Sequence, residues 1–181
     1  MRLLRTELLE GHGVAVAGPA AEGIASALGE LGARVEALER LDKSEDDQVG
    51  SWARARSPLR ALVYDARAPF QGGGPQALTR TMHEAWLAVR EVAVGALIEG
   101  AEPGKVVLIG PAPDSGPHAE AAGAALENLA RTLSVEWARY GVTTVMVAPR
   151  PGVDGGRLAE LVAFLCSPAA DYVSGARFEV G

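Results

Sequence analysis

The sequence predicts an α/β fold, a doubly wound parallel sheet of about six strands between two layers of helices. Short apolar runs alternate along the chain with segments whose apolar residues recur at helical spacing. The apolar runs are hydrophobic throughout, as expected of strands that are buried on both faces. No repeat and no long linker divides the 181 residues, so we expect one domain spanning residues 1–181.

The first half of the chain contains three predicted strands, Gly13–Gly18, Ala33–Leu38 and Leu59–Ala66. Between the first two, residues 20–32 place apolar side chains at helical spacing and end in glycine, which is typical of a helix C-terminus. A charged loop and a short, weak helix separate the second strand from the third.

The second half repeats this alternation with longer helices. The predicted elements are a helix over Gln76–Glu99, a strand over Lys105–Gly110, a helix over His118–Arg139, a strand over Val142–Pro149, a helix over residues 155–168 and a last strand over residues 176–181. Right-handed crossovers make this a three-layer, Rossmann-like domain. Ligands of such folds bind beyond the carboxyl ends of the strands, so the loops there are the places to search for function.

Composition excludes several classes of partner. The formal net charge is -6, and no basic stripe is visible, so neither nucleic acid nor an anionic membrane is a predicted partner. No apolar run reaches membrane-spanning length and the N-terminus does not resemble a signal peptide, so we expect a cytoplasmic protein. Cys166 is the only cysteine, and the three histidines lack the spacing of metal ligands, so no metal site is predicted.

Several segments in consecutive order resemble the short-chain dehydrogenase/reductase (SDR) family, and in particular its members that resemble 3-oxoacyl-ACP reductases. The motifs are "GKVVLIG", "GAALENLARTLSVEWARYGVTTVMVAP" and "LAELVAFLCSPAADYVSGARFEVG" in the second half of the chain. The first half matches more loosely through "GHGVAVAG", "LGARVEALER" and "LRALVYDARA". The chain is shorter than typical members of the family.

The resemblance also shows which reactive residues are missing. Family members carry a Tyr-x-x-x-Lys pair, in which the tyrosine is the general acid/base, and a serine that follows a central strand. Alignment places Ala119 at the tyrosine, Gly123 at the lysine and Pro111 at the serine. The asparagine of the preceding helix falls near Thr81. We therefore expect no catalytic residues at the family positions.

Three other residues are weak candidates for relocated chemistry, because their positions lie near the carboxyl edge of the predicted sheet. They are His118, Ser115 and Tyr64. Acid/base catalysis needs a group within hydrogen-bond reach and with a pKa near the working pH. For His118 the simpler interpretation is an exposed residue near a helix N-terminus, and for Tyr64 it is a half-buried packing aromatic.

The resemblance implies an NAD(P) site that is reduced in this chain. Gly18 keeps the strand-ending glycine, but the loop after it is about three residues short and Pro19 lacks an amide donor. Glu39 aligns with the acidic residue that binds the adenosine ribose, and Arg40 is placed to meet a 2′-phosphate. We treat these positions as vestigial and expect no cofactor, with NAD(P) as the alternative. The strand lining the adenine pocket and the substrate lid are also predicted to be missing.

The two long helices keep apolar stripes that the resemblance associates with subunit contacts. In the family these helices form a four-helix bundle across a two-fold axis. The candidate interface residues are Trp86, Val89, Ala93, Leu126, Leu129, Leu133 and Trp137. The competing interpretation is that every one of these side chains belongs to the core of the single chain.

The main functional hypothesis is a non-catalytic SDR-fold subunit that assembles with an active SDR oxidoreductase, or with itself, and supports or regulates it. The first alternative is an NAD(P)-dependent oxidoreductase with relocated catalytic residues. The second is a nucleotide or small-molecule sensor that uses the crevice around Gly18, Glu39 and Tyr64.

Overall fold

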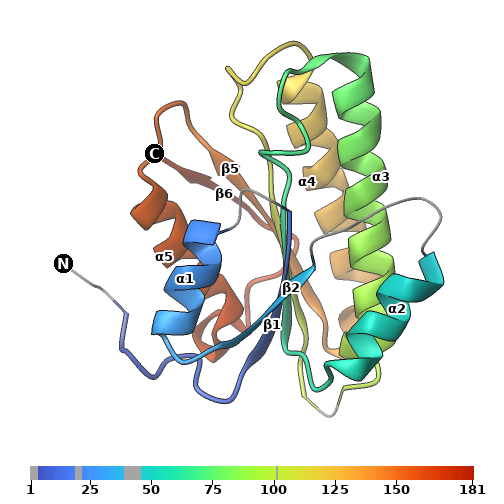
Figure 1. Cartoon of the computed structure of the whole chain (residues 1–181), viewed down its shortest axis with the longest axis vertical. Helices are drawn as coiled ribbons and strands as arrows, with labels where there is room; N and C mark the ends of the chain where they lie inside the picture. Colours follow the sequence, from blue (N-terminus) through green and yellow to red (C-terminus); the bar gives the residue numbers. More distant parts are fainter. Residues whose placement is uncertain (1–3, 19–21, 39–45, 101) are drawn as a thin grey trace.

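A six-stranded sheet, parallel throughout and in the order β2-β1-β3-β4-β5-β6, forms the centre of the molecule (Figure 1). The computed structural model describes residues 4–18, 22–38, 46–100 and 102–181. The strands are β1 Gly13–Ala17, β2 Arg34–Leu38, β3 Ala61–Asp65, β4 Lys105–Ile109, β5 Thr143–Pro149 and β6 Arg177–Val180. Each lies within a segment predicted from its apolar run, which confirms the predicted fold class.

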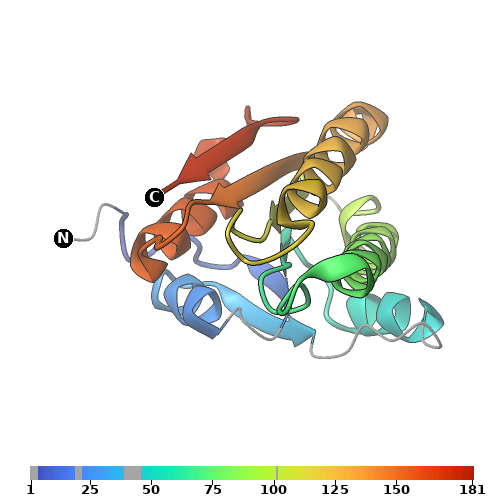
Figure 2. The same ribbon diagram turned by 90° about the horizontal axis from the view of Figure 1, so that it is seen from above.

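Helices cover both faces of the sheet, as Figures 1 and 2 show. Helices α1 (Glu22–Glu30) and α5 (Gly155–Cys166) lie on one face, and their apolar residues join one buried cluster with the sheet. Helices α2 (Asp46–Ala55), α3 (Gly74–Val92) and α4 (Ala119–Glu136) lie on the other and form a second cluster. The chain is therefore doubly wound, and the strand order reverses between β1 and β3.

Helix α3 ends differently from the predicted continuous helix. After Val92 the chain passes into a π-helical turn, Ala93–Leu97, that contains Gly95. A β-carbon added at Gly95 would lie 3.0 Å from the carbonyl oxygen of Gly50 in α2. The absence of a side chain therefore lets the end of α3 approach the α2 backbone closely.

The buried stripe of α3 also begins on different residues. The periodicity places Leu78 and Met82 on the sheet-facing side, but both are half-buried, and Ala77 and Thr81 take the buried positions. Ala77 packs with Phe70 and with Ala119 and Ala122 of α4, in a small cluster at the N-terminal ends of the two helices. Small side chains there allow a close approach between α3 and α4.

Most of the predicted interface stripe is core. Val89, Ala93, Leu126, Leu133 and Trp137 are all at most 9% exposed within the single chain, and Leu129 is half-buried. These five side chains belong to the cluster between the sheet and helices α2, α3 and α4, which favours the competing interpretation that they are core residues of the single chain. Trp86 differs, because 44% of it is exposed on α3.

The two edges of the sheet are β2 and β6. Within the described residues no strand lies beyond β2, and the connection from β2 to β3 contains α2 alone. At the other end, β6 alternates exposed and half-buried residues, with Arg177 and Glu179 exposed. The sheet is thus open at β6, where the chain reaches Gly181.

The assignment of Leu133 to the core can be tested by truncation. We expect Leu133→Ala to lower the free energy of unfolding by about 2–5 kcal/mol, because it leaves a cavity under α4. The half-exposed Trp86→Ala is the comparison and should cost about 1 kcal/mol or less. Urea denaturation measures both. If Leu133→Ala left the stability unchanged but altered the oligomeric state, Leu133 would be an interface residue and not a core residue.

Candidate functional site

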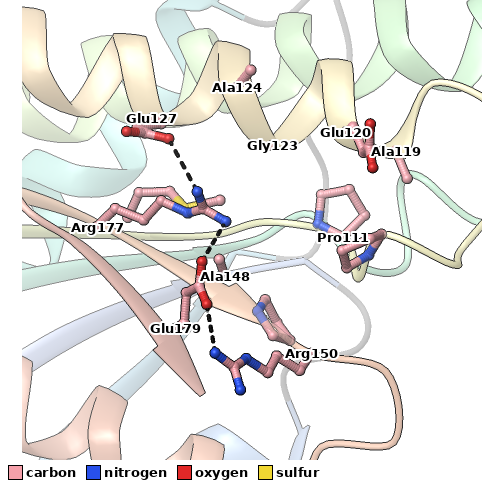
Figure 3. A pocket seen from close by; sticks show the side chains of 13 residues that line it. Pro111, Ala119, Glu120, Gly123, Ala124, Glu127, Ala148, Arg150, Arg177 and Glu179 are labelled. Carbon is pink, nitrogen blue, oxygen red and sulfur yellow. Dashed lines mark hydrogen bonds and ion pairs between the residues drawn. The ribbon is translucent and has the colours of Figure 1, made fainter. Parts of the chain in front are cut away.

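A pocket of about 440 Å³ opens at the carboxyl edge of the sheet, between α4 and strands β5 and β6 (Figure 3). Strand β4 ends beside it, so the pocket lies where a parallel sheet places its ligands. Its lining residues are Pro111, Pro113, Ala119, Glu120, Gly123, Ala124, Glu127, Met146, Ala148, Pro149, Arg150, Arg177 and Glu179.

The three positions that the sequence predicts to correspond to the family's catalytic residues all line this pocket. Pro111 is buried beyond the end of β4, and Ala119 and Gly123 lie one turn apart on α4. None of the three carries a hydroxyl or amine. A β-carbon added at Gly123 would meet only the Met146 methyl carbon, at 3.9 Å. The space for a longer side chain is therefore present, while the side chain is absent.

A row of alternating charges lines the other side of the pocket, across α4, β6 and the residue after β5 (Figure 3). The Arg177 guanidinium lies 3.8 Å from Glu127 and 3.1 Å from Glu179, and Arg150 lies 2.9 Å from the second oxygen of Glu179. The hydrogen bond from Arg150, reinforced by the charges of Arg177 and Arg150, lowers the pKa of Glu179. Each charge in this row has an opposite neighbour.

Tyr64 is unsuited to acid/base chemistry. It is completely buried, rather than half-buried as the simpler interpretation had it, and its hydroxyl donates to the carbonyl oxygen of Thr81 over 3.1 Å. Burial, with smaller contributions from the charges of Glu84 and Asp65, raises the Tyr64 pKa above its ordinary value. The pKa of the Tyr64 hydroxyl thus lies above the range that proton transfer near neutral pH requires.

His118 and Ser115 lie in the exposed loop between β4 and α4, but neither lines the pocket. His118 is the residue before α4, and its φ of 70° is left-handed, a conformation that histidine adopts more readily than most residues. Its side chain makes no capping hydrogen bond to the helix. The structure therefore does not bring the three substitute candidates together in one site.

The crevice where the strand order reverses holds an ion pair that the sequence analysis did not identify. Asp65, at the end of β3, is 0% exposed, and the Arg67 guanidinium donates to both of its carboxylate oxygens, with the shortest contact at 2.6 Å. The Arg67 backbone N–H also donates to it. Hydrogen bonding to Asp65 raises the pKa of Arg67, so this guanidinium stays charged.

Gly18, at the end of β1, lies directly beside this ion pair. Its φ is 111°, and an added β-carbon would sit 2.5 Å from the carbonyl oxygen of Asp65. The glycine thus permits a close approach between β1 and β3. Glu39 and Arg40, the other predicted cofactor positions, lie outside the described residues.

Whether a dinucleotide fits the described residues can be judged at a second hollow, of about 690 Å³. It lies between α1 and the N-terminus of α5, and Gly23, Arg67 and Gly155 are among its lining residues. Asp154 already caps α5 by accepting from the Arg157 backbone N–H at 2.9 Å. Acidic Glu30, Asp154 and Glu160 share the hollow with Arg67 and Arg157, and the Arg157 guanidinium already donates to the carbonyl oxygen of Gly181 at 2.7 Å. The lining is therefore net acidic, which disfavours a diphosphate. At the pocket, Ala119 and Gly123 offer no donor to a nicotinamide ribose.

Sequence reasoning missed the Asp65–Arg67 pair and the charged row for different reasons. An aspartate at a strand end followed two residues later by arginine was a local signal for the first. The charged row joins Glu127 of α4 to Glu179 of β6. These residues come together only because α4 packs on β5 and β6 pairs with β5. Two classes of site also lack support in the part of the chain that is described: no cluster of three metal-ligating side chains occurs there, and no helix there has the length and apolarity that a membrane span requires.

No protein-family model and no curated protein sequence matches the chain. Solved structures do match. They include the citronellol catabolism dehydrogenase AtuB of Pseudomonas aeruginosa PAO1, at 23% identity and a TM-score of 0.78 over 99% of this chain and 97% of that one. A Serratia marcescens short-chain dehydrogenase/reductase mutant matches at 21% identity and a TM-score of 0.75, covering 95% of this chain and 96% of that one.

A Bacillus cereus enoyl-acyl carrier protein reductase, solved with NADP+, also matches, at 14% identity and a TM-score of 0.75 over 96% of each chain. At these identities the likeness shows the fold, which is that of the SDR oxidoreductases. With 181 residues this chain is shorter than typical SDRs. Among the described residues, α2 is the one element between β2 and β3, and residues 150–154 alone connect β5 to α5.

The Asp65–Arg67 pair yields a prediction about stability. We expect Arg67→Ala to lower the free energy of unfolding by about 1–3 kcal/mol, because the buried carboxylate of Asp65 loses its charged donor. Arg131→Ala is the matched control, since Arg131 forms an exposed ion pair with Glu127, and it should cost about 0.5 kcal/mol or less. Chemical denaturation compares the two, and equal costs would show that burial of Asp65 does not depend on Arg67.

Proposed function

We propose that this chain is a non-catalytic subunit with the SDR fold, which assembles with an active SDR oxidoreductase or with itself and supports or regulates it. One observation carries the proposal. Pro111, Ala119 and Gly123, which align with the family's serine, tyrosine and lysine, line one open pocket and offer no group that transfers a proton. These three residues support a role for the pocket that does not include proton transfer.

The charged groups of the pocket do not replace the missing ones. Glu127 and Glu179 both face the Arg177 guanidinium, and Glu179 also accepts from Arg150. A carboxyl whose pKa is lowered, as that of Glu179 is, gives up its proton early and is a poor general acid at neutral pH. The row of charges therefore favours a structural or binding role over proton transfer.

The charges of the crevice are consistent with a proposed role in which the chain binds no dinucleotide. The Asp65–Arg67 pair lies at the switch point of the sheet, where Rossmann-like folds bind their cofactors, and Arg67 extends into the hollow beside α1. A bound diphosphate there would compete with Asp65 for the Arg67 guanidinium and would face Asp154 and Glu160. Both effects oppose binding of an anion.

The assembly half of the proposal rests on the outer faces of α3 and α4, which lie side by side. Trp86 on α3 is 44% exposed and Val135 on α4 is 78% exposed. Large apolar side chains on neighbouring helices are surface that a partner subunit would cover. Fewer residues support assembly than the sequence suggested, because the other residues of the predicted stripe are buried or half-buried.

The proposal predicts that the purified chain neither binds nor oxidises nicotinamide cofactors. Titration calorimetry with NADH and with NADPH up to millimolar concentration should give no binding heat, since the described crevice opposes a diphosphate. An active SDR measured in the same buffer is the control. Saturable binding of either cofactor, accompanied by reduction of a carbonyl substrate, would overturn the proposal.

An oxidoreductase with relocated catalytic residues is the second candidate, and the fold comparisons favour it, because dehydrogenases and reductases make up the matched structures described above. In that case His118 is the best available acid/base. His118→Ala would then lower kcat/KM by about 10²–10⁴-fold and flatten the pH–rate profile. Ser115→Ala, in the same loop, is the matched comparison. Under our proposal neither variant has turnover to lose.

A further inference from the structure

The pocket beside α4 combines an apolar wall with a charged rim (Figure 3). The wall is formed by small or apolar residues, namely Pro111, Ala119, Gly123, Met146 and Ala148. The rim carries acids and arginines, namely Glu120, Glu127, Arg150, Arg177 and Glu179. A ligand with an apolar body and a polar head would match both parts of this surface.

The two arginines of the rim keep N–H donors for a ligand. The Arg177 guanidinium lies 3.8 Å from Glu127, which is longer than a hydrogen bond, and 3.1 Å from Glu179. Arg150 lies 2.9 Å from Glu179. A guanidinium has several N–H donors in a planar fork, so these contacts saturate neither arginine. Both can therefore also donate to a carboxylate.

Glu120 is an acid of the rim that has no partner. It is exposed in the first turn of α4, and among the described residues its carboxylate takes part in no hydrogen bond or ion pair. Glu127 on the same helix is different, because it pairs with Arg131 at 2.7 Å. Figure 3 shows Glu120 and Arg150 on opposite sides of the pocket. The pocket thus offers an unpaired carboxylate as well as arginine donors.

The charges of the rim disfavour a ligand with a single charge. Three acids and two arginines give the rim a formal charge of -1. A carboxylic acid alone would meet the arginines but would also lie near Glu120 and Glu179, and an amine alone would lie near both guanidinium groups. Like charges at such range repel. A head that carries one positive and one negative group gives each charge an opposite neighbour.

We propose that this pocket binds a free α-amino acid with an apolar side chain. Arg150 and Arg177 receive its carboxylate, and Glu120 and Glu179 receive its ammonium group. Both charges of an α-amino acid are attached to one carbon, which suits a rim where acids and arginines alternate. The head stays at the exposed rim, where the charges keep part of their hydration, while the side chain leaves water.

The wall provides the space for that side chain. A β-carbon added at Gly123 would meet only the Met146 methyl carbon, at 3.9 Å, so an opening remains above Met146. Ala119 and Ala148 border it with short side chains. The volume of about 440 Å³ lies in the lower part of the range of about 300–1,000 Å³ that small-molecule sites occupy. The pocket is therefore large enough for one amino acid of the size of leucine.

The competing explanation is that the rim is a set of solvated surface ion pairs, which are common on proteins. Such pairs need neither an apolar opening beside them nor an unpaired acid such as Glu120. A hollow of about 420 Å³ at the amino edge of the sheet provides a comparison. Its arginine, Arg60, is paired with Glu102 and lies near Glu10, so no arginine is left there to receive a carboxylate.

The inference goes beyond the proposed function, and the two fail separately. Binding of an amino acid is measured on the chain alone, whether or not it assembles with a partner. Cofactor binding with turnover would overturn the non-catalytic role without removing the amino-acid site. Absence of amino-acid binding would overturn the site and leave the assembling role in place.

Titration calorimetry with L-leucine tests the inference. We expect saturable binding with a dissociation constant of about 1 mM or below. The analogues 4-methylpentanoate and 3-methylbutylamine keep the apolar chain but lack one charge, and glycine lacks the chain. Each should bind about tenfold more weakly or less. The inference is wrong if L-leucine shows no saturable binding, or if either single-charge analogue binds as tightly as L-leucine.

Variants locate the binding in this pocket. Gly123→Leu fills the opening above Met146 and should abolish binding, while the helix gains a residue of higher propensity and stays folded. Gly29→Leu is the matched control, because Gly29 lies in α1 with open space around it. Glu120→Gln should raise the dissociation constant about tenfold, and Glu136→Gln, at the exposed end of α4, should not. Circular dichroism melting confirms folding. A folded Gly123→Leu or Glu120→Gln protein that binds L-leucine like the wild type would contradict the assignment.

Discussion

Backbone hydrogen bonding between parallel strands is the constraint on which the rest of this structure depends. Because all six strands run the same way, their carboxyl ends gather at one edge, and residues far apart in sequence meet there. Pro111 after β4, Arg150 after β5 and Glu179 at the end of β6 share one pocket for this reason. The same constraint places Asp65 beside Gly18, since β1 and β3 are neighbours at the switch point.

The small residues of α4 have opposite effects on packing and on chemistry. Ala119 and Ala122 are buried and let the start of the helix pack closely, while Gly123 leaves an opening above Met146. A large, polar side chain at Ala119 or Gly123 would fill part of the pocket and supply a reactive group. Their absence leaves a wide pocket whose only charged members are the paired acids and arginines of its rim, together with Glu120.

Ion pairs in this molecule differ in what they can do because they differ in burial. The Asp65–Arg67 pair holds a completely buried carboxylate and fixes the crevice between β1 and β3. In the row from Glu127 to Arg150, only Glu127 is half-buried and the other three residues are exposed, so solvent screens these pairs and they contribute little to stability. Arg177 and Glu179 of this row are exposed at the rim of the pocket.

The sequence by itself determined the fold class, the strand and helix segments and the identity of the residues at the reactive positions. Helical periodicity and continuous apolar runs are local signals. The positions of Ala119, Gly123 and Pro111 were predicted from the register of the motifs. The tertiary structure decided which apolar side chains are core. Leu126 and Leu133 lie on a stripe that suits either a core or an interface, and only the packing of α4 on the sheet separates the two. The tertiary structure also decided that the Tyr64 hydroxyl is buried and donates to the carbonyl oxygen of Thr81, and that Arg177 and Glu179 lie on an edge strand. Both outcomes depend on neighbours that are distant in sequence.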